Sequence, residues 1–149
     1  MYAIVRCTLT RLLFALPALA AAQVQTPLVG YVTKPQYDWV MHCQGCHGAD
    51  ALGTPGSVPR LAGTVARFLK VEAGRAYLGR VPGVAFAALS DSDVAALLNW
   101  VVLRFDFDHV PQGFTPYSRE EIGQLRRSPL ISHAYRERRR LLQLLAAER

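Results

Sequence analysis

The stretch MHCQGCHGAD, residues 41–50, places two cysteines and two histidines within six positions. Cys43, Cys46 and His47 form the C-x-x-C-H pattern that is typical of covalent haem attachment. One helical turn brings the two thiols to positions where each can add to a haem vinyl group, and the adjacent imidazole then faces the iron. Two such bonds let a small chain keep its cofactor without enclosing it deeply. The pattern therefore favours one covalently attached haem c.

Two other uses of the same stretch stay open as alternatives. A zinc site usually needs four ligands, but His42, His109 and His133 are separated by long gaps without a paired pattern. A thioredoxin-like redox dithiol would need a βαβ context, which the sequence does not indicate.

The first 22 residues have the order of a secretory signal peptide. Arg6 and Arg11 precede the apolar run LLFALPALAAA, which is short for a membrane-spanning helix and ends in small residues. We predict cleavage near Ala20 or Ala22 and export to the periplasm; the alternative is a buried N-terminal helix or an uncleaved anchor. Both cysteines that remain after cleavage lie in the quoted stretch.

The remaining chain predicts helices and shows no convincing strand alternation, so the predicted fold class is all-α. Tyr37, Val40 and Met41 suggest the apolar face of the first helix. Ser90, three residues before Asp93, predicts the start of the clearest helix. We expect helices within residues 35–43, 64–81 (interrupted near Gly74), 91–105, 119–130 and 132–149, and connections over 48–63, 82–89 and 106–118.

Three segments, CQGCHG (43–48), VPRLAG (58–63) and ALSDSDVAALLNWVV (88–102), together resemble the class I cytochrome c family. The resemblance covers about residues 31–105. It implies a helical domain whose N- and C-terminal helices cross around an edge-exposed haem, with Tyr37 and Trp100 at the crossing. We divide the chain into a signal peptide (1–22), a haem domain (23–105) and a connector with a basic helical tail (106–149).

The resemblance also assigns roles to individual residues. Cys43 and Cys46 would carry the thioether bonds, and His47 would be the proximal iron ligand. The carbonyl of Pro59 would accept a hydrogen bond from that imidazole, which fixes the ring and raises its basicity. Leu61 would pack against the haem edge.

The chain departs from the family on the other side of the iron. The family usually supplies a distal methionine before the last helix, but YLGRVPGVAFAAL (77–89) contains no Met, His or Lys. Met41 and His42 are too close to the attachment turn to reach the opposite face. His109 or His133 could fold back as the sixth ligand, or a partner subunit could supply it. Otherwise the iron stays open, with an apolar distal pocket lined by Val81, Val84, Phe86 or Leu89.

The excess positive charge lies in the tail. Residues 23–118 contain seven basic and seven acidic side chains, whereas residues 119–149 contain eight arginines and four glutamates. The tail could dock on an acidic redox partner protein or an anionic membrane surface. The interpretation we favour is a helix whose leucines cover the haem domain while its arginines face solvent. Export argues against nucleic acid as a partner.

The function we expect is that of a periplasmic c-type cytochrome that carries single electrons and is not an enzyme. It could also be the cytochrome subunit of a dehydrogenase system. The alternative function is a haem-based binder or sensor of small ligands, or a weak peroxidase, with an open distal site.

Overall fold

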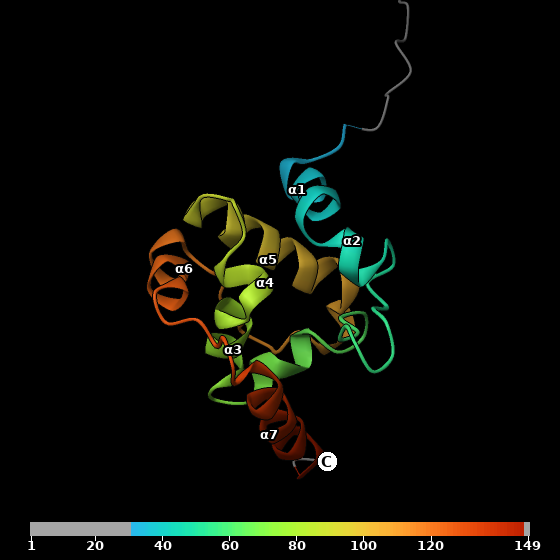
Figure 1. Cartoon of the computed structure of the whole chain (residues 1–149), viewed down its shortest axis with the longest axis vertical. Coiled ribbons are helices and arrows are strands. Elements are labelled where there is room, and N and C mark those ends of the chain that lie inside the picture. Colours follow the sequence, from blue (N-terminus) through green and yellow to red (C-terminus); the bar gives the residue numbers. More distant parts are fainter. Residues whose placement is uncertain (1–30, 148–149) are drawn as a thin grey trace, which may run out of the picture. The chain divides into compact units, whose positions relative to one another are not determined.

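The computed structural model of the chain describes residues 31–147 (Figure 1). The predicted signal peptide and its cleavage sites lie outside the described residues. Within residues 31–147 the fold is all-α, and β-type pairing is limited to one isolated bridge between Thr54 and Val58. The helices are α1 (Lys34–His42), α2 (Gln44–His47), η1 (Ala66–Lys70), α3 (Gly74–Arg80), α4 (Pro82–Ala85), α5 (Asp91–Phe105), η2 (Phe107–His109), α6 (Arg119–Arg126) and α7 (Ala134–Ala147).

Helix α5 is the central element of the domain. Its N-terminus is capped as predicted, because the Ser90 hydroxyl accepts a hydrogen bond from the backbone N–H of Asp93 at 3.1 Å. Its apolar stripe is buried and packs against α1 and α6. None of the helices in the described part of the chain is both long and apolar enough to cross a bilayer.

Helix α1 crosses α5 through a different face from the one predicted. Tyr37, Val40 and Met41 are exposed, whereas Trp39 is buried and packs on Phe105 with ring centroids 4.7 Å apart. The prediction that Tyr37 lies at the crossing is therefore wrong. The i, i+3, i+4 pattern did mark one face of the helix, but burying the indole of Trp39 removes more apolar surface from water.

The buried face of α1 also carries a carboxylate. Asp38 is 2% exposed and accepts a hydrogen bond from Lys34 Nζ at 2.7 Å. The same ammonium lies 3.0 Å from Asp93 at the start of α5. This ion pair compensates the buried charge and joins the two crossing helices.

The helical segment predicted over residues 64–81 is interrupted near Gly74, as the sequence indicated. Helix η1 ends at Lys70 and α3 begins at Gly74, where an added Cβ would collide with the carbonyl of Phe68. The following segment contains a short helix, α4, where we expected only a connection. Pro82 stands in its first turn, a position that tolerates the missing N–H of proline.

The C-terminal helices pack onto the rest of the domain. Ser118 caps α6, since its hydroxyl accepts a hydrogen bond from the backbone N–H of Glu121 at 3.2 Å. Helix α6 packs against α5 and α3, and α7 against η1 and α3. Ile122 and Leu141 are fully buried. The basic tail is thus built into the same hydrophobic core.

Candidate functional site

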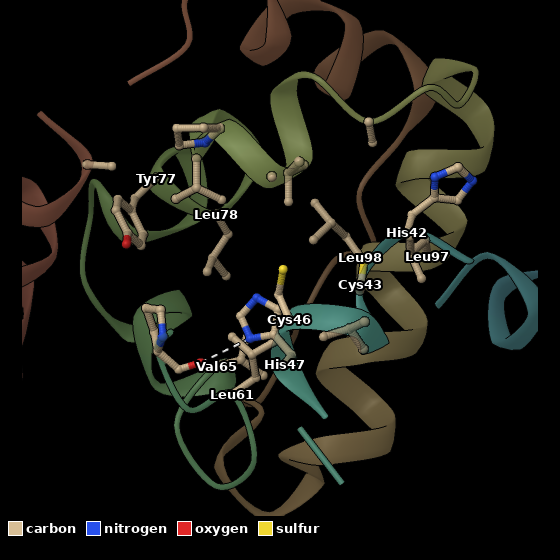
Figure 2. Close-up of a pocket in the computed structure, with 18 of the residues that line it drawn as sticks. His42, Cys43, Cys46, His47, Leu61, Val65, Tyr77, Leu78, Leu97 and Leu98 are labelled. Carbon is tan, nitrogen blue, oxygen red and sulfur yellow. Dashed lines mark hydrogen bonds between the residues drawn. The ribbon is translucent and has the colours of Figure 1, made fainter. Parts of the chain in front are cut away.

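A cavity of about 370 Å³ lies at the C-x-x-C-H turn (Figure 2). Its walls come from this turn, the following loop, α3, α4, α5 and the start of α7. Most of the side chains that line it are aliphatic or aromatic. Such a cavity suits a largely apolar cofactor that is oriented by a few polar groups.

The turn brings both cysteines to this cavity. Cys43 ends α1, and Cys46 lies one turn later in α2. Both are free thiols and both line the cavity. Burial, with smaller contributions from the charges of Cys46 and Asp38, raises the pKa of the Cys43 thiol to about 11. Figure 2 shows the sulfur of Cys46 pointing into the open space above His47.

The imidazole of His47 is held by one backbone carbonyl. Its Nδ1 lies 3.0 Å from the carbonyl oxygen of Pro59, so with a proton on Nδ1 the ring donates this hydrogen bond. Nε2 then keeps its lone pair for a metal. Burial lowers the pKa of His47, the Pro59 bond opposes this, and the charge of Arg138 lowers it further. A lowered pKa favours the neutral form of the ring, which is the form that binds metals.

No family model matches the chain. Among curated proteins it is similar to cytochrome c-552 of Thermus thermophilus, with 36% identity over 106 residues that cover 59% of this chain and 81% of the relative. A second cytochrome c-552 of the same species matches with the same identity over 72% of its length. The chain belongs to the class I c-type cytochromes. It is therefore an electron-transfer protein rather than an enzyme, with covalently bound haem c.

The residues of the cavity fit this cofactor. Two thiols and an oriented imidazole are the donor set that haem c needs, and the rest of the lining is mainly apolar. Trp39 also lines the cavity, and its Nε1 is the one buried side-chain polar atom without a partner in the part of the chain that the structure describes. An unpaired buried N–H costs about 1–3 kcal/mol, which a bound group with an acceptor can remove. Residues 31–147 hold no cluster of three or more His, Cys, Asp or Glu side chains for a metal such as zinc.

Pro59 and Leu61 lie in the loop that follows the C-x-x-C-H turn. Both line the cavity beside His47, and Leu61 is partly buried against the core. Backbone hydrogen bonds from Leu61 N–H and Ala62 N–H to the Ala51 carbonyl, at 2.9 and 3.1 Å, fix this loop. The loop after the C-x-x-C-H turn therefore holds the carbonyl that orients the imidazole.

The structure does not bring His109 to the cavity. Its Nδ1 lies 2.5 Å from a carboxylate oxygen of Asp106, and its Nε2 lies 2.7 Å from a guanidinium nitrogen of Arg67. Asp106 is itself buried, and its other oxygen accepts the N–H of Ala66 at 2.6 Å. His109 thus belongs to a polar cluster that joins η1 to η2.

The other candidate ligands lie elsewhere too. His133 is exposed, contacts Ser132 and Arg136, and does not line the cavity. Met41 is 59% exposed on α1. His42 lines the rim of the cavity next to the cysteine turn, and its side chain is exposed.

Sequence reasoning missed the contribution of the tail to the cavity. Ile131, Ala134, Tyr135 and Arg138 all line it. Their spacing of i, i+3, i+4 and i+7 is the helical pattern that could have found them, although Ile131 lies in the turn that precedes α7. Arg138 lies over the ring of Phe68, with its guanidinium carbon 5.1 Å from the ring centroid. This arginine brings a positive charge to the cavity wall.

Proposed function

We propose that this cytochrome is a periplasmic carrier of single electrons whose haem c is attached through Cys43 and Cys46, with His47 as the proximal ligand. The observation that carries the proposal is the pairing of His47 Nδ1 with the Pro59 carbonyl beside two free thiols in one apolar cavity. Haem bound there supplies a one-electron couple.

The residues around the cavity influence the reduction potential of the haem and the ease of electron transfer. Pro59 keeps the imidazole oriented, and its carbonyl raises the basicity of the ring. Leu61 and the aliphatic side chains of α5 exclude water from the cavity, which limits the reorganisation that accompanies a change of charge. Arg138 adds a fixed positive charge that favours the reduced state.

The signal peptide that the sequence predicts over residues 1–22 supports the periplasmic location. The second part of the proposal is a redox partner with an acidic surface, either a separate acceptor or the dehydrogenase of which this chain is the cytochrome subunit. Arg136 and Arg139 are exposed on α7 and are available for such docking. Contacts of this kind speed encounter and weaken with salt.

The test is production of the full chain in cells that attach haem c, followed by cell fractionation and an optical redox titration. We expect a coloured periplasmic protein whose titration follows a single one-electron curve. The variant His47→Ala should lose this couple, and Cys43→Ser with Cys46→Ser should lose covalently retained haem, whereas His133→Ala should retain both. A colourless wild-type protein from competent cells would contradict the proposal.

A further inference from the structure

The wall of the cavity opposite His47 is aliphatic. Figure 2 shows Leu78 across the cavity from the imidazole. Val81, Val84 and Ala87, from the start of α4 to the turn after it, follow Leu78 in the chain and also line the cavity. None of these side chains carries a nitrogen or sulfur atom that could bind iron. Leu97 and Leu98 of α5 close the same side.

This wall is fixed in place by the tail. Arg126 of α6 donates hydrogen bonds to the carbonyls of Ala85, Ala87 and Leu89 at 3.1, 2.7 and 3.0 Å. It also pairs with Asp91 at 2.7 Å. One guanidinium thus satisfies three backbone carbonyls of the turn between α4 and α5. The segment that would have to supply a sixth ligand is held by its backbone in a conformation that presents only apolar side chains.

The other possible donors are engaged or exposed. His109 is held between Asp106 and Arg67. Lys34, at the start of α1, pairs with the carboxylates of Asp38 and Asp93. After the predicted cleavage near Ala20 or Ala22, the residues that precede the described part contain no Met, His, Lys or Cys. His42, at the rim of the cavity, is the one histidine besides His47 that lines it within residues 31–147.

We propose that this cytochrome binds a small neutral diatomic molecule on the face of the haem opposite His47, in the pocket formed by Leu78, Val81, Val84 and Leu98. The inference rests on the proposed attachment of haem at the C-x-x-C-H turn. The chemical class follows from these four side chains: none of them can donate a hydrogen bond, so burying an anion among them would be costly. Tyr77 and Arg138 also line the cavity but are not part of this pocket. An iron with an open position and an apolar pocket is suited to such ligands.

Carbon monoxide is the probe, added to the reduced full-length protein while the visible spectrum is recorded. We expect the gas to shift the main absorption band of the wild type, and the variants His42→Gln, His109→Gln and His133→Gln to respond in the same way. A six-coordinate reduced spectrum that carbon monoxide leaves unchanged would overturn the proposal. If one histidine variant then gained a response, that histidine would be the ligand and the proposal would again be wrong.

Two variants locate the site. Val84→Phe fills the proposed pocket and should weaken carbon monoxide binding by about tenfold or more, through overpacking. Leu103→Phe makes the same kind of change on a half-exposed position of α5 outside the cavity and should change the affinity less than about twofold. If both variants bound carbon monoxide with the same affinity, the ligand would not lie in the pocket that includes Val84, and the proposal would be wrong.

The failure of this inference can be told apart from that of the proposed function. If the protein retains no haem covalently, the proposed attachment site is wrong, irrespective of any response to carbon monoxide. A protein with haem on the C-x-x-C-H turn that rejects carbon monoxide contradicts only the open pocket. Covalent retention is measured on the denatured chain, so it does not depend on the spectrum of the folded protein.

Discussion

The two sides of the cavity are built in different ways. The His47 side comes from one continuous segment, residues 43–61, in which the cysteine turn and the Pro59 carbonyl lie close together in the chain. The opposite side is assembled from α3, α4, α5 and α7, and Arg126 of α6 ties its central turn to the tail. The first side has polar groups aimed into the cavity, whereas the second presents mainly apolar surface.

The two sides of the cavity therefore make different demands on the sequence. The His47 side needs particular atoms at particular places, so a local motif can encode it. The opposite side needs a wall of the right shape, which many apolar sequences can supply. We conclude that the tail of this cytochrome stabilises the wall, and the following variants test how far the wall depends on it.

The largest effect is expected from the core of the tail. Leu141→Ala deletes a fully buried side chain of α7 and should lower the free energy of unfolding by about 2–5 kcal/mol. Leu144→Ala, at a position that is 42% exposed, is the matched control and should cost less than about 0.5 kcal/mol. Chemical denaturation measures both. If the two variants were equally stable, the tail would be an appendage rather than part of the core.

The next largest effect is expected at Arg126, whose hydrogen bonds hold the turn between α4 and α5. Arg126→Gln removes hydrogen bonds to three backbone carbonyls and should lower the free energy of unfolding by about 2–3 kcal/mol. Hydrogen exchange should rise in residues 82–91 and stay unchanged at residues 43–47. The neighbouring exposed Arg127 has no side-chain hydrogen bond in the described structure, so Arg127→Gln is the control. Faster exchange at the cysteine turn would show that the two sides are not independent.

A smaller effect depends on pH. Tyr117 is 4% exposed and donates a hydrogen bond to the Arg75 carbonyl at 2.9 Å; burial raises its pKa, although the charge of Arg75 opposes this. Because the folded state holds the phenol proton more tightly than the unfolded state, the stabilisation is present below the ordinary pKa of about 10 and is lost as the pH rises above it.

Tyr117→Phe should therefore cost about 1 kcal/mol at neutral pH and reduce the loss of stability between pH 9 and about pH 11. Thermal unfolding across this range provides the measurement. An alkaline loss as steep in the variant as in the wild type would mean that another group is responsible.

The smallest effect is on the reduction potential. Arg138 brings a positive charge to the cavity and contributes to lowering the pKa of His47 after burial. Arg138→Gln should lower the midpoint potential by an amount on the order of tens of millivolts, since the oxidised site carries more positive charge. Arg139→Gln, on the exposed side of the same helix, should shift it less. Equal shifts would indicate a general charge effect of the tail.

The sequence predicted the His47 side well, because its information is local. The resemblance carried by the C-x-x-C-H motif and by VPRLAG implied the hydrogen bond between His47 and the Pro59 carbonyl that the structure shows. The cap at Ser90 was confirmed for the same reason, since it involves residues three apart. The roles of these residues toward haem stay predictions.

The sequence predicted that the opposite side is apolar, and Val81 and Val84 do line the cavity, whereas Phe86 and Leu89 do not. It did not predict how this side is held together, because its contacts join residues about 40 positions apart. Arg126 reaches Ala85, and Arg75 pairs with Glu121 at 2.6 Å. The pattern of Tyr37, Val40 and Met41 misled for a related reason, since the position of α5 decides which face of α1 is buried. Only tertiary contacts settle such choices.

The most direct test of the account is the mass of the peptide that contains Cys43 and Cys46, taken from the denatured, matured protein. The account predicts that this peptide carries the added mass of one haem and that every other peptide has the mass of its amino acids alone. A peptide over residues 41–50 at its bare mass, isolated from cells that attach haem to other cytochromes, would contradict the central claim.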